Sequence, residues 1–131
     1  MLIQSLLDDH EGVRHNAVKS LVLIGSPSVP QLIDTLENKD RIMQLRVIDV
    51  LGRFGKVAIP ELQQALYYNN AEVCRGIISA LGSIGEDAVP ILQEILSHQD
   101  SQMRWSAAHA LKKIDSPIAK KVLSEYLNRG R

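Results

Sequence analysis

The chain has 131 residues, which suits one domain, and a domain of this length buries about two-thirds of the surface that its unfolded chain exposes. Aromatic residues make up only 4% of it and hydrophobic residues 45%, so the core must be aliphatic. Lys and Arg equal Asp and Glu at 15 each, and this balance disfavours a general nucleic-acid or membrane binder, which is usually basic.

The N-terminal residues MLIQSLLDDHEG predict a short helix rather than a secretory leader, because they lack a basic start and a long apolar run. No stretch approaches the roughly 18 apolar residues of a membrane span. Cys74 is the only cysteine, which excludes an intrachain disulfide and favours a reducing compartment. We therefore expect a cytoplasmic protein.

A spacing of 30 residues then repeats along the whole chain. It joins Gly25, Gly55 and Gly85, with Asp115 on the next step, and three of the five prolines follow the same spacing: Pro30, Pro60 and Pro90. Three leucine columns keep the same register: Leu21, Leu51, Leu81 and Leu111; Leu2, Leu32, Leu62 and Leu92; Leu6, Leu36, Leu66 and Leu96. Such columns predict an array of structural repeats within one domain, residues 1–131.

Each repeat is predicted to hold two helices. The first is short and carries a proline such as Pro30 in its first turn, where the missing N–H has no intrahelical partner to lose. The second follows an N-cap such as Asp40, has a broad apolar stripe at helical spacing, and stops at a glycine such as Gly55. Asn70 and Asp100 repeat the N-cap, while His10 departs from it.

These signals predict an all-α fold with nine helices, at residues 2–8, 11–24, 27–38, 41–54, 57–68, 72–84, 87–97, 101–114 and 117–128. A lone helix pair cannot bury its apolar stripes, but stacked pairs can, and so the repeats form one continuous core. The prediction is an α-solenoid of about four and a half helix pairs. Its repeats are residues 1–25 (partial), 26–55, 56–85 and 86–115, with a capping helix at 116–131.

The repeat units resemble HEAT repeats, and most closely the subtype named after phycobilisome lyases. Residues Asp87–Pro90 match the opening of that subtype's motif. The second half of the motif is matched by Asp100, Met103, Arg104, Ala107, Ala108, Ala110 and Leu111, and in the first unit by Val13, Arg14, Ala17 and Leu21. The resemblance covers almost the whole chain and implies a right-handed superhelix, but it is specific for fold and poor for function.

The chain departs from this family pattern at one column. The motif arginine is present as Arg14 and Arg104 but is replaced by Gln44 and Cys74. In the family this arginine commonly packs between repeats. The resemblance therefore implies that aliphatic contacts hold the middle of the stack.

In HEAT-like stacks the second helices line the concave face, and the positions off the apolar stripe are its exposed ones. They form four rows: His15, Leu45, Arg75, Trp105; Asn16, Arg46, Gly76, Ser106; Lys19, Asp49, Ser79, His109; Leu23, Arg53, Ser83, Lys113. These rows vary strongly, which is typical of a recognition face, although solvent exposure alone also permits variation. The candidate partner-binding residues are Trp105, Arg75, His109, Leu45, Arg46, Asp49, His15, Lys19, Arg53 and Lys113.

Trp105 is the sharpest candidate, because tryptophan and arginine dominate interface hot spots and Arg75 lies one repeat away in the same row. His109 follows one helical turn after Trp105, on the same side. The alternative is that Trp105 folds down over the next repeat and only packs. Gly76 and Gly82 stand within a helix, either to form a depression beside Arg75 or to allow close helix contact.

Catalytic and metal-binding patterns are absent from the sequence. Its histidines, His10, His15, His98 and His109, form neither an i, i+4 pair nor a Cys/His cluster. It has no phosphate-binding glycine loop and no nucleophile elbow, and the adjacent carboxylates are typical of helix caps. We expect no enzymatic activity, no catalytic residue, no metal and no cofactor.

The leading functional hypothesis is a scaffold that binds another protein or peptide on its concave face. One alternative is the handling of a bilin chromophore, in a manner similar to that of bilin lyases or of other phycobilisome-associated proteins. Another is nucleic-acid binding by the basic end, since residues 104–131 carry 7 basic and 2 acidic side chains, whereas residues 1–103 carry 8 and 13. The N-terminal edge lacks a polar cap, because it exposes the apolar residues Leu2, Ile3, Leu6 and Leu7. We therefore expect either that the chain is part of a longer solenoid or that this edge self-associates.

Overall fold

The structure, a computed structural model, describes residues 2–68 and 70–129. Every regular element in this part of the chain is a helix. Four are 3-10 helices: η1 (Gln4–Leu7), η2 (Ser26–Ser28), η3 (Gly55–Ala58) and η4 (Glu86–Ala88). The α-helices are α1 (Glu11–Ile24), α2 (Val29–Thr35), α3 (Arg41–Phe54), α4 (Ile59–Tyr68), α5 (Ala71–Ile84), α6 (Val89–Ile95), α7 (Ser101–Ile114) and α8 (Pro117–Arg129).

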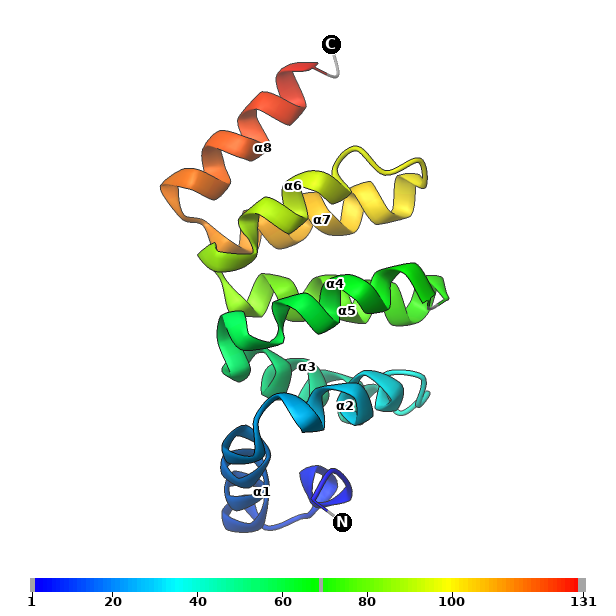
Figure 1. Ribbon diagram of the computed structural model, residues 1–131, viewed down its shortest axis with the longest axis vertical. Coiled ribbons are helices and arrows are strands. Elements are labelled where there is room, and N and C mark those ends of the chain that lie inside the picture. The colour runs from blue at the N-terminus through cyan, green and yellow to red at the C-terminus, as the bar shows by residue number, and fades with distance from the viewer. Residues whose placement is uncertain (1, 69, 130–131) are drawn as a thin grey trace.

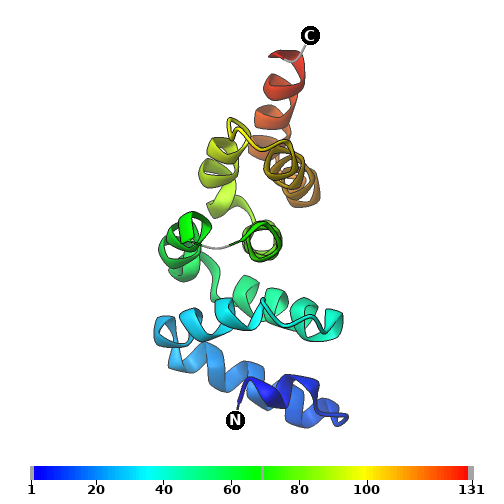
Figure 2. The ribbon, with the colours of Figure 1, turned by 90° about the vertical axis from the view of Figure 1, so that its right-hand side faces the viewer.

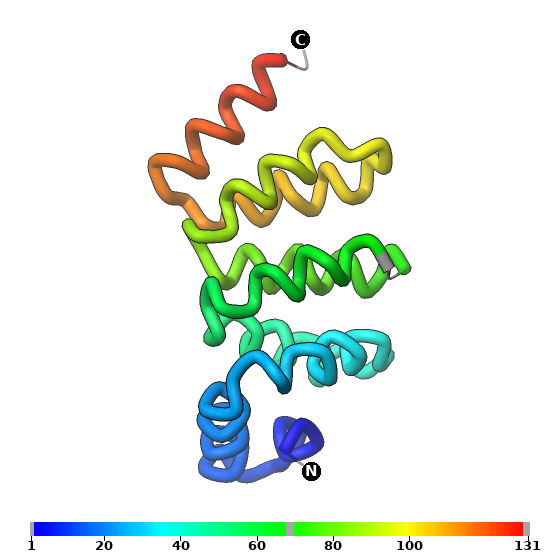
Figure 3. The backbone as a smooth tube through the Cα atoms, viewed as in Figure 1, coloured from blue at the N-terminus to red at the C-terminus, as the bar shows by residue number. Residues whose placement is uncertain are grey.

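The helices stack in two columns, which gives the elongated shape of a solenoid (Figures 1 and 2). One column holds the first helices of the repeats, α2, α4 and α6, and the other holds the second helices, with α3 packed on α5 and α5 on α7. The two ends of the chain lie at opposite ends of the stack (Figure 3). The predicted all-α solenoid is confirmed.

The leucine columns form the core of this stack. Leu51, Leu81 and Leu111 are completely buried, and so are Leu32 and Leu62 from the first helices. The core is almost wholly aliphatic, with Phe54 as its single buried aromatic side chain among the described residues. These leucines belong to one continuous cluster of buried residues that runs from repeat to repeat.

The second helices begin and end as the sequence predicts. Asp40 accepts hydrogen bonds from the N–H groups of Ile42 and Met43, and Asn70 and Asp100 also cap through their side chains, whereas His10 does not. The helices end at three glycines with φ of 81°, 67° and 98° and ψ near −150°, a conformation almost restricted to glycine: Gly25, Gly55 and Gly85. Asp115, on the next step, adopts the ordinary left-handed conformation instead, which aspartate tolerates.

The first helices differ from the prediction in length and type. The helix expected at 27–38 divides into the 3-10 turn η2 and the α-helix α2, which ends at Thr35, and η4 with α6 repeats this division. The helix expected at 2–8 is only the 3-10 helix η1. This segment has no side-chain N-cap and few residues, so the cost of nucleating an α-helix is not recovered.

The motif arginine hydrogen-bonds to the loop that joins the two helices of its own repeat. Arg14 donates to the carbonyl oxygen of Asp8 at 2.7 Å, and Arg104 donates to those of His98 and Gln99 at 2.7 and 2.8 Å. These acceptors follow the first helix of the same repeat. In this chain the guanidinium group thus hydrogen-bonds to the loop between the two helices of its own repeat and not to the neighbouring repeat.

The two substitutions in this column make the same connection. Gln44 donates through Nε2 to the carbonyl oxygens of Leu36 at 3.3 Å and Asn38 at 2.7 Å. Cys74 donates through its thiol to the carbonyl oxygen of Leu66 at 3.5 Å. The two middle repeats thus keep a side-chain hydrogen bond to the carbonyl groups at the end of their first helix, with a neutral donor in place of a cation.

Replacing Arg104 tests this fastening. We expect Arg104→Leu to lower the free energy of unfolding by about 1 kcal/mol, since it removes two hydrogen bonds whose acceptors are exposed to water. Arg104→Gln should retain part of that stability, because Gln44 already makes the same connection. Urea unfolding followed by circular dichroism measures both. Equal losses in the two variants would show that the loop does not depend on the donor.

Two glycines allow the second helices to approach one another closely. A Cβ atom on Gly52 of α3 would lie 2.6 Å from the Cβ of Ser83 on α5, and one on Gly82 would lie 3.1 Å from the Cβ of Ala110 on α7. Each glycine faces a small side chain in the next repeat. Of the two roles considered for Gly82, close helix contact is the one that the structure shows.

We expect Gly52→Ala to destabilise the protein by about 1–2 kcal/mol. The overlap with Ser83 costs more than the roughly 1 kcal/mol that alanine gains from its helix propensity. Gly12→Ala is the matched control, because Gly12 also lies in a helix but a Cβ there would meet nothing within 4 Å. Thermal and urea unfolding should separate the two, and a Gly52→Ala variant as stable as Gly12→Ala would refute the close-packing argument.

Candidate partner-binding face

The rows assigned to the second-helix face are open to solvent. Leu45 is 51% exposed and Trp105 is 66% exposed, although both are large hydrophobic residues. His15 and Arg75, the other members of their row, are exposed as well. The structure therefore places this row on the surface, as expected from its position off the apolar stripe.

A groove crosses this surface over three successive repeats, and we call it the α3–α5–α7 groove. Its volume is about 430 Å³. It brings together five of the ten candidate residues: Leu45, Arg75, Trp105, His109 and Lys113. Its other lining residues are Leu36, Arg41, Gln44, Ile48, Glu72, Gly76, Ser79 and Ser106.

Four other candidates line a separate hollow of about 240 Å³ between α1 and α3: His15, Arg46, Asp49 and Arg53. The three arginines that line it, Arg14 among them, are already engaged within the protein. Arg46 donates to the carbonyl oxygen of Leu6, and Arg53 forms an ion pair with Asp49 at 3.2 Å. Lys19, the tenth candidate, is exposed and lines neither hollow. The predicted single face thus divides into two parts with different chemistry.

Trp105 and His109 form a stacked pair on α7. Their ring centroids lie 5.4 Å apart and their planes differ by 6°, as the i, i+4 spacing on one helix allows. The indole is held by this neighbour on its own helix and remains two-thirds exposed. The structure therefore does not show the alternative in which Trp105 is covered by the next repeat.

Gly76 lies in the groove and fits both roles considered for it. It lines the hollow beside Arg75, and a Cβ at this position would come within 3.2 Å of Cδ2 of Leu36. The missing side chain leaves space in the groove wall and also lets Leu36 approach α5. This position therefore connects the packing of the core to the shape of the groove.

Sequence reasoning missed two charged residues of the groove, Arg41 and Glu72. Arg41 precedes Leu45 by one turn of α3, and Glu72 precedes Arg75 by three residues on α5, so each shares a helix face with a residue that was found. Extending the rows by one turn toward the N-terminal ends of the helices would have included them.

Cys74 is 4% exposed, and its thiol contacts the first helix of its own repeat through the carbonyl oxygen of Leu66. Burial raises the pKa of the Cys74 thiol, because removal from water disfavours the charged thiolate. The residue is therefore buried and also links its loop to the first helix of the repeat. A buried neutral thiol is a poor nucleophile.

We expect Cys74 to react with a disulfide reagent at pH 8 about 100-fold more slowly in the folded protein than in guanidinium chloride, because the thiolate is both buried and disfavoured. A raised pKa also means that the thiolate fraction at pH 8 is below that of a free cysteine. A colorimetric thiol assay measures the rates, with Cys74→Ser as the blank. Equally fast reaction in both conditions would contradict the burial.

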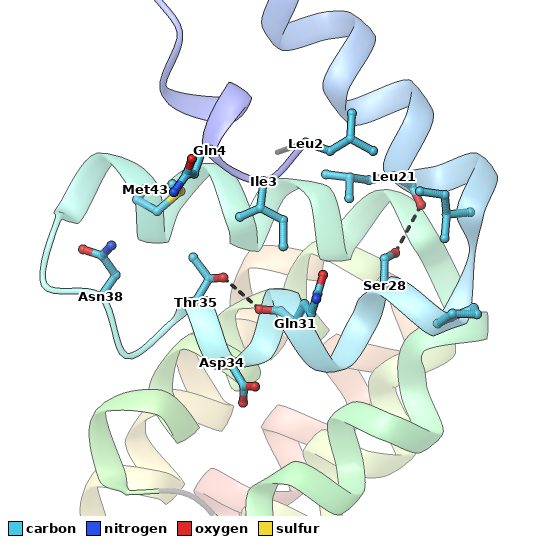
Figure 4. A pocket seen from close by; sticks show the side chains of 12 residues that line it. Leu2, Ile3, Gln4, Leu21, Ser28, Gln31, Asp34, Thr35, Asn38 and Met43 are labelled. Carbon is cyan, nitrogen blue, oxygen red and sulfur yellow. Dashed lines mark hydrogen bonds between the residues drawn. The ribbon is translucent and has the colours of Figure 1, made fainter.

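A third hollow lies at the N-terminal edge, between η1, the end of α1 and α2. It has a volume of about 760 Å³, and Figure 4 shows Leu2, Ile3 and Leu21 on one side and Gln31 and Thr35 of α2 on the other. It is left open because η1 packs on α1 and α3 and does not extend along α2.

The expected exposure of four apolar residues at this edge is only partly right. Leu2 and Leu7 are exposed, and Ile3 is half-buried. Leu6 is 1% exposed, and its carbonyl oxygen accepts the hydrogen bond from Arg46. The prediction that Leu6 takes part in an exposed edge is wrong, because η1 turns this residue into the core.

Within residues 2–68 and 70–129, no three His, Cys, Asp or Glu side chains gather as potential metal ligands. Over the same residues, no helix combines the length and the apolar composition that crossing a bilayer requires.

Comparison with known proteins identifies the fold family. The sequence matches the family model described as HEAT repeats over residues 1–82 and 59–131, which together span the whole chain. No curated protein matches it significantly.

Two similar solved structures are both crystal structures of engineered proteins from the Northeast Structural Genomics Consortium. The first is 21% identical, with 97% of this chain and 67% of that chain covered and a TM-score of 0.43. The second is 18% identical, with 95% and 40% covered and a TM-score of 0.40. With the family model matched from end to end, the chain belongs to the HEAT-repeat family.

Proposed function

We propose that this protein is a non-catalytic scaffold that holds another protein on the second-helix face of its solenoid. HEAT-repeat scaffolds generally mediate protein interactions. The observation that carries the proposal is the α3–α5–α7 groove, in which an exposed tryptophan lies among charged side chains contributed by three repeats. Tryptophan and arginine at the centre of a concave surface are typical of interface hot spots. A buried cysteine thiol that forms no disulfide suits the cytoplasm, which we propose as its compartment.

The stacked pair gives this surface a defined shape. Trp105 and His109 hold each other in one orientation, so less side-chain freedom is lost when a partner covers them. The groove is built on α3, α5 and α7, whose mutual packing makes it a rigid platform rather than a loop. Both features favour recognition of a partner by a preformed surface.

The two alternative functions find less support. Against chromophore handling, the family match is to HEAT repeats in general and not specifically to the phycobilisome-lyase subtype. In addition, Cys74 is buried, so its thiol is not accessible for attachment of a tetrapyrrole. For nucleic-acid binding, the basic end is partly engaged within the protein. Arg104 fastens a loop, and Lys120 forms an ion pair with Asp115 at 3.3 Å.

Affinity capture from the source cell's lysate tests the proposal. We expect the wild-type protein to retain a specific partner and Trp105→Ala/Arg75→Glu to lose it, since truncating a hot-spot tryptophan costs about 2 kcal/mol or more of binding free energy. The matched control is Leu127→Ala/Lys121→Glu, which also removes an exposed hydrophobic residue and reverses a charge, but outside the groove.

All three proteins must first give the same circular dichroism spectrum and unfolding midpoint. A partner lost by the groove variant alone supports the proposal. If the groove variant and the control retain the same proteins as the wild type, the second-helix face is not the working surface, and the N-terminal edge with Leu2 and Leu7 becomes the next candidate.

A further inference from the structure

We propose that the α3–α5–α7 groove binds a short acidic peptide segment whose carboxylates pair with Arg75, Lys113 and Arg41 and whose apolar side chain packs against Trp105. This inference rests on the proposed function and specifies the chemistry of the partner. It is independent of the identity of the protein that carries the segment.

The first argument is the charge of the groove. Its lining contains three cations, one on each successive second helix: Arg41 on α3, Arg75 on α5 and Lys113 on α7. The lining contains one carboxylate, Glu72, which lies in the first turn of α5, where the helix dipole favours it. The groove therefore has a net positive charge in a chain whose formal net charge is zero.

The second argument is that these cations are unengaged. Among the described residues, none of the three forms an ion pair or a hydrogen bond, unlike Arg46 and Arg53 in the neighbouring hollow. Arg75 is only three residues from Glu72 on the same helix and still makes no ion pair with it. An incoming carboxylate would thus gain charge-assisted hydrogen bonds without first displacing an internal partner.

The third argument is the apolar surface between the charges. Leu45 and Trp105 are both more than half exposed, and the half-buried Ile48, on the same helix as Leu45, also lines the groove. A partner that offered only carboxylates would leave this surface in water. A segment that combines acidic residues with a large apolar one would cover both kinds of surface.

The fourth argument is size. Packed helices lie about 8–10 Å apart, so the distance from α3 to α7 is about 16–20 Å. An extended peptide rises about 3.3 Å per residue and would cross the groove with about five or six residues. A segment of that length can place carboxylates against two or three of the cations and one apolar side chain against Trp105.

The charge outside the groove favours such a segment over a nucleic acid. Residues 1–103 carry 8 basic and 13 acidic side chains, a net charge of −5, so a long polyanion would be repelled along most of the stack. A short peptide feels mainly the local field of the groove. The cations alone do not separate the two, so the experiment includes an oligonucleotide.

Trp105 is the only tryptophan, so its fluorescence reports directly on the groove. The probe is a capped six-residue peptide with glutamate at positions 1 and 5, leucine at position 3 and serine elsewhere, so that the three side chains lie on one face of the extended chain. It is titrated into the full chain at 0.1 M salt or below. The neutral comparison peptide has glutamine in place of every glutamate. A single-stranded thymidine oligonucleotide tests the other anionic ligand.

We expect the acidic peptide to change the emission of Trp105 with saturation and the glutamine peptide to bind at least about tenfold more weakly, as loss of charge-assisted hydrogen bonds requires. Arg75→Gln/Lys113→Gln should weaken the acidic peptide by about the same factor. Lys112→Gln/Lys121→Gln removes the same charge from exposed positions outside the groove and should leave the affinity within about twofold.

Three results would overturn the inference: equal binding of the glutamine peptide, equal weakening by both lysine-containing double variants, or tighter saturable binding of the oligonucleotide. Absence of peptide binding up to 1 mM would also reject it. In that case the capture experiment still decides the proposed function, because a partner lost only by Trp105→Ala/Arg75→Glu would show a working groove with different partner chemistry.

Discussion

Burial of the leucine columns between successive helix pairs is the interaction on which the rest of the structure depends. Neither helix of a pair can remove its apolar stripe from water alone, so Leu51, Leu81 and Leu111 are covered only when the next pair is present. Close approach at Gly52 and Gly82 follows from the same requirement, since the second helices must be near enough to cover each other's leucines. The regular stack then fixes where every other side chain of a repeat points.

The stack separates residues that must be constant from those that are free to differ. Positions facing the next repeat keep leucine or a small residue, whereas the outer row of the second helices holds an imidazole, an isobutyl group, a guanidinium and an indole in turn. Packing therefore supplies a rigid support, and chemistry varies on it from one repeat to the next. The α3–α5–α7 groove is the part of this surface where the variable positions converge and their charges remain unengaged.

The fold follows from the sequence to a large extent, because a 30-residue period constrains many positions together. The helices expected at 41–54 and 101–114 have those bounds in the structure. The sequence alone could not predict that the first helix is a 3-10 helix, since its type depends on how Leu6 packs into the core against neighbouring helices. The exposure of Trp105 followed from periodicity, but the division of the candidates between two hollows depends on how α1 and α3 pack, which no local pattern records.

One hydrogen-bonded column bears on how such an array can lengthen. It consists of the donors that close the loop within each repeat: Arg14, Gln44, Cys74 and Arg104. Each of these donors finds its acceptor inside its own repeat, so no polar bond of this set joins one repeat to another. A tandem duplication of one 30-residue unit would carry its complete fastening with it and would meet its neighbours through leucine and glycine surfaces that every unit shares. Gain or loss of whole units therefore leaves none of these four donors without its acceptor, and the reach of the array can change while the loop inside each repeat stays the same.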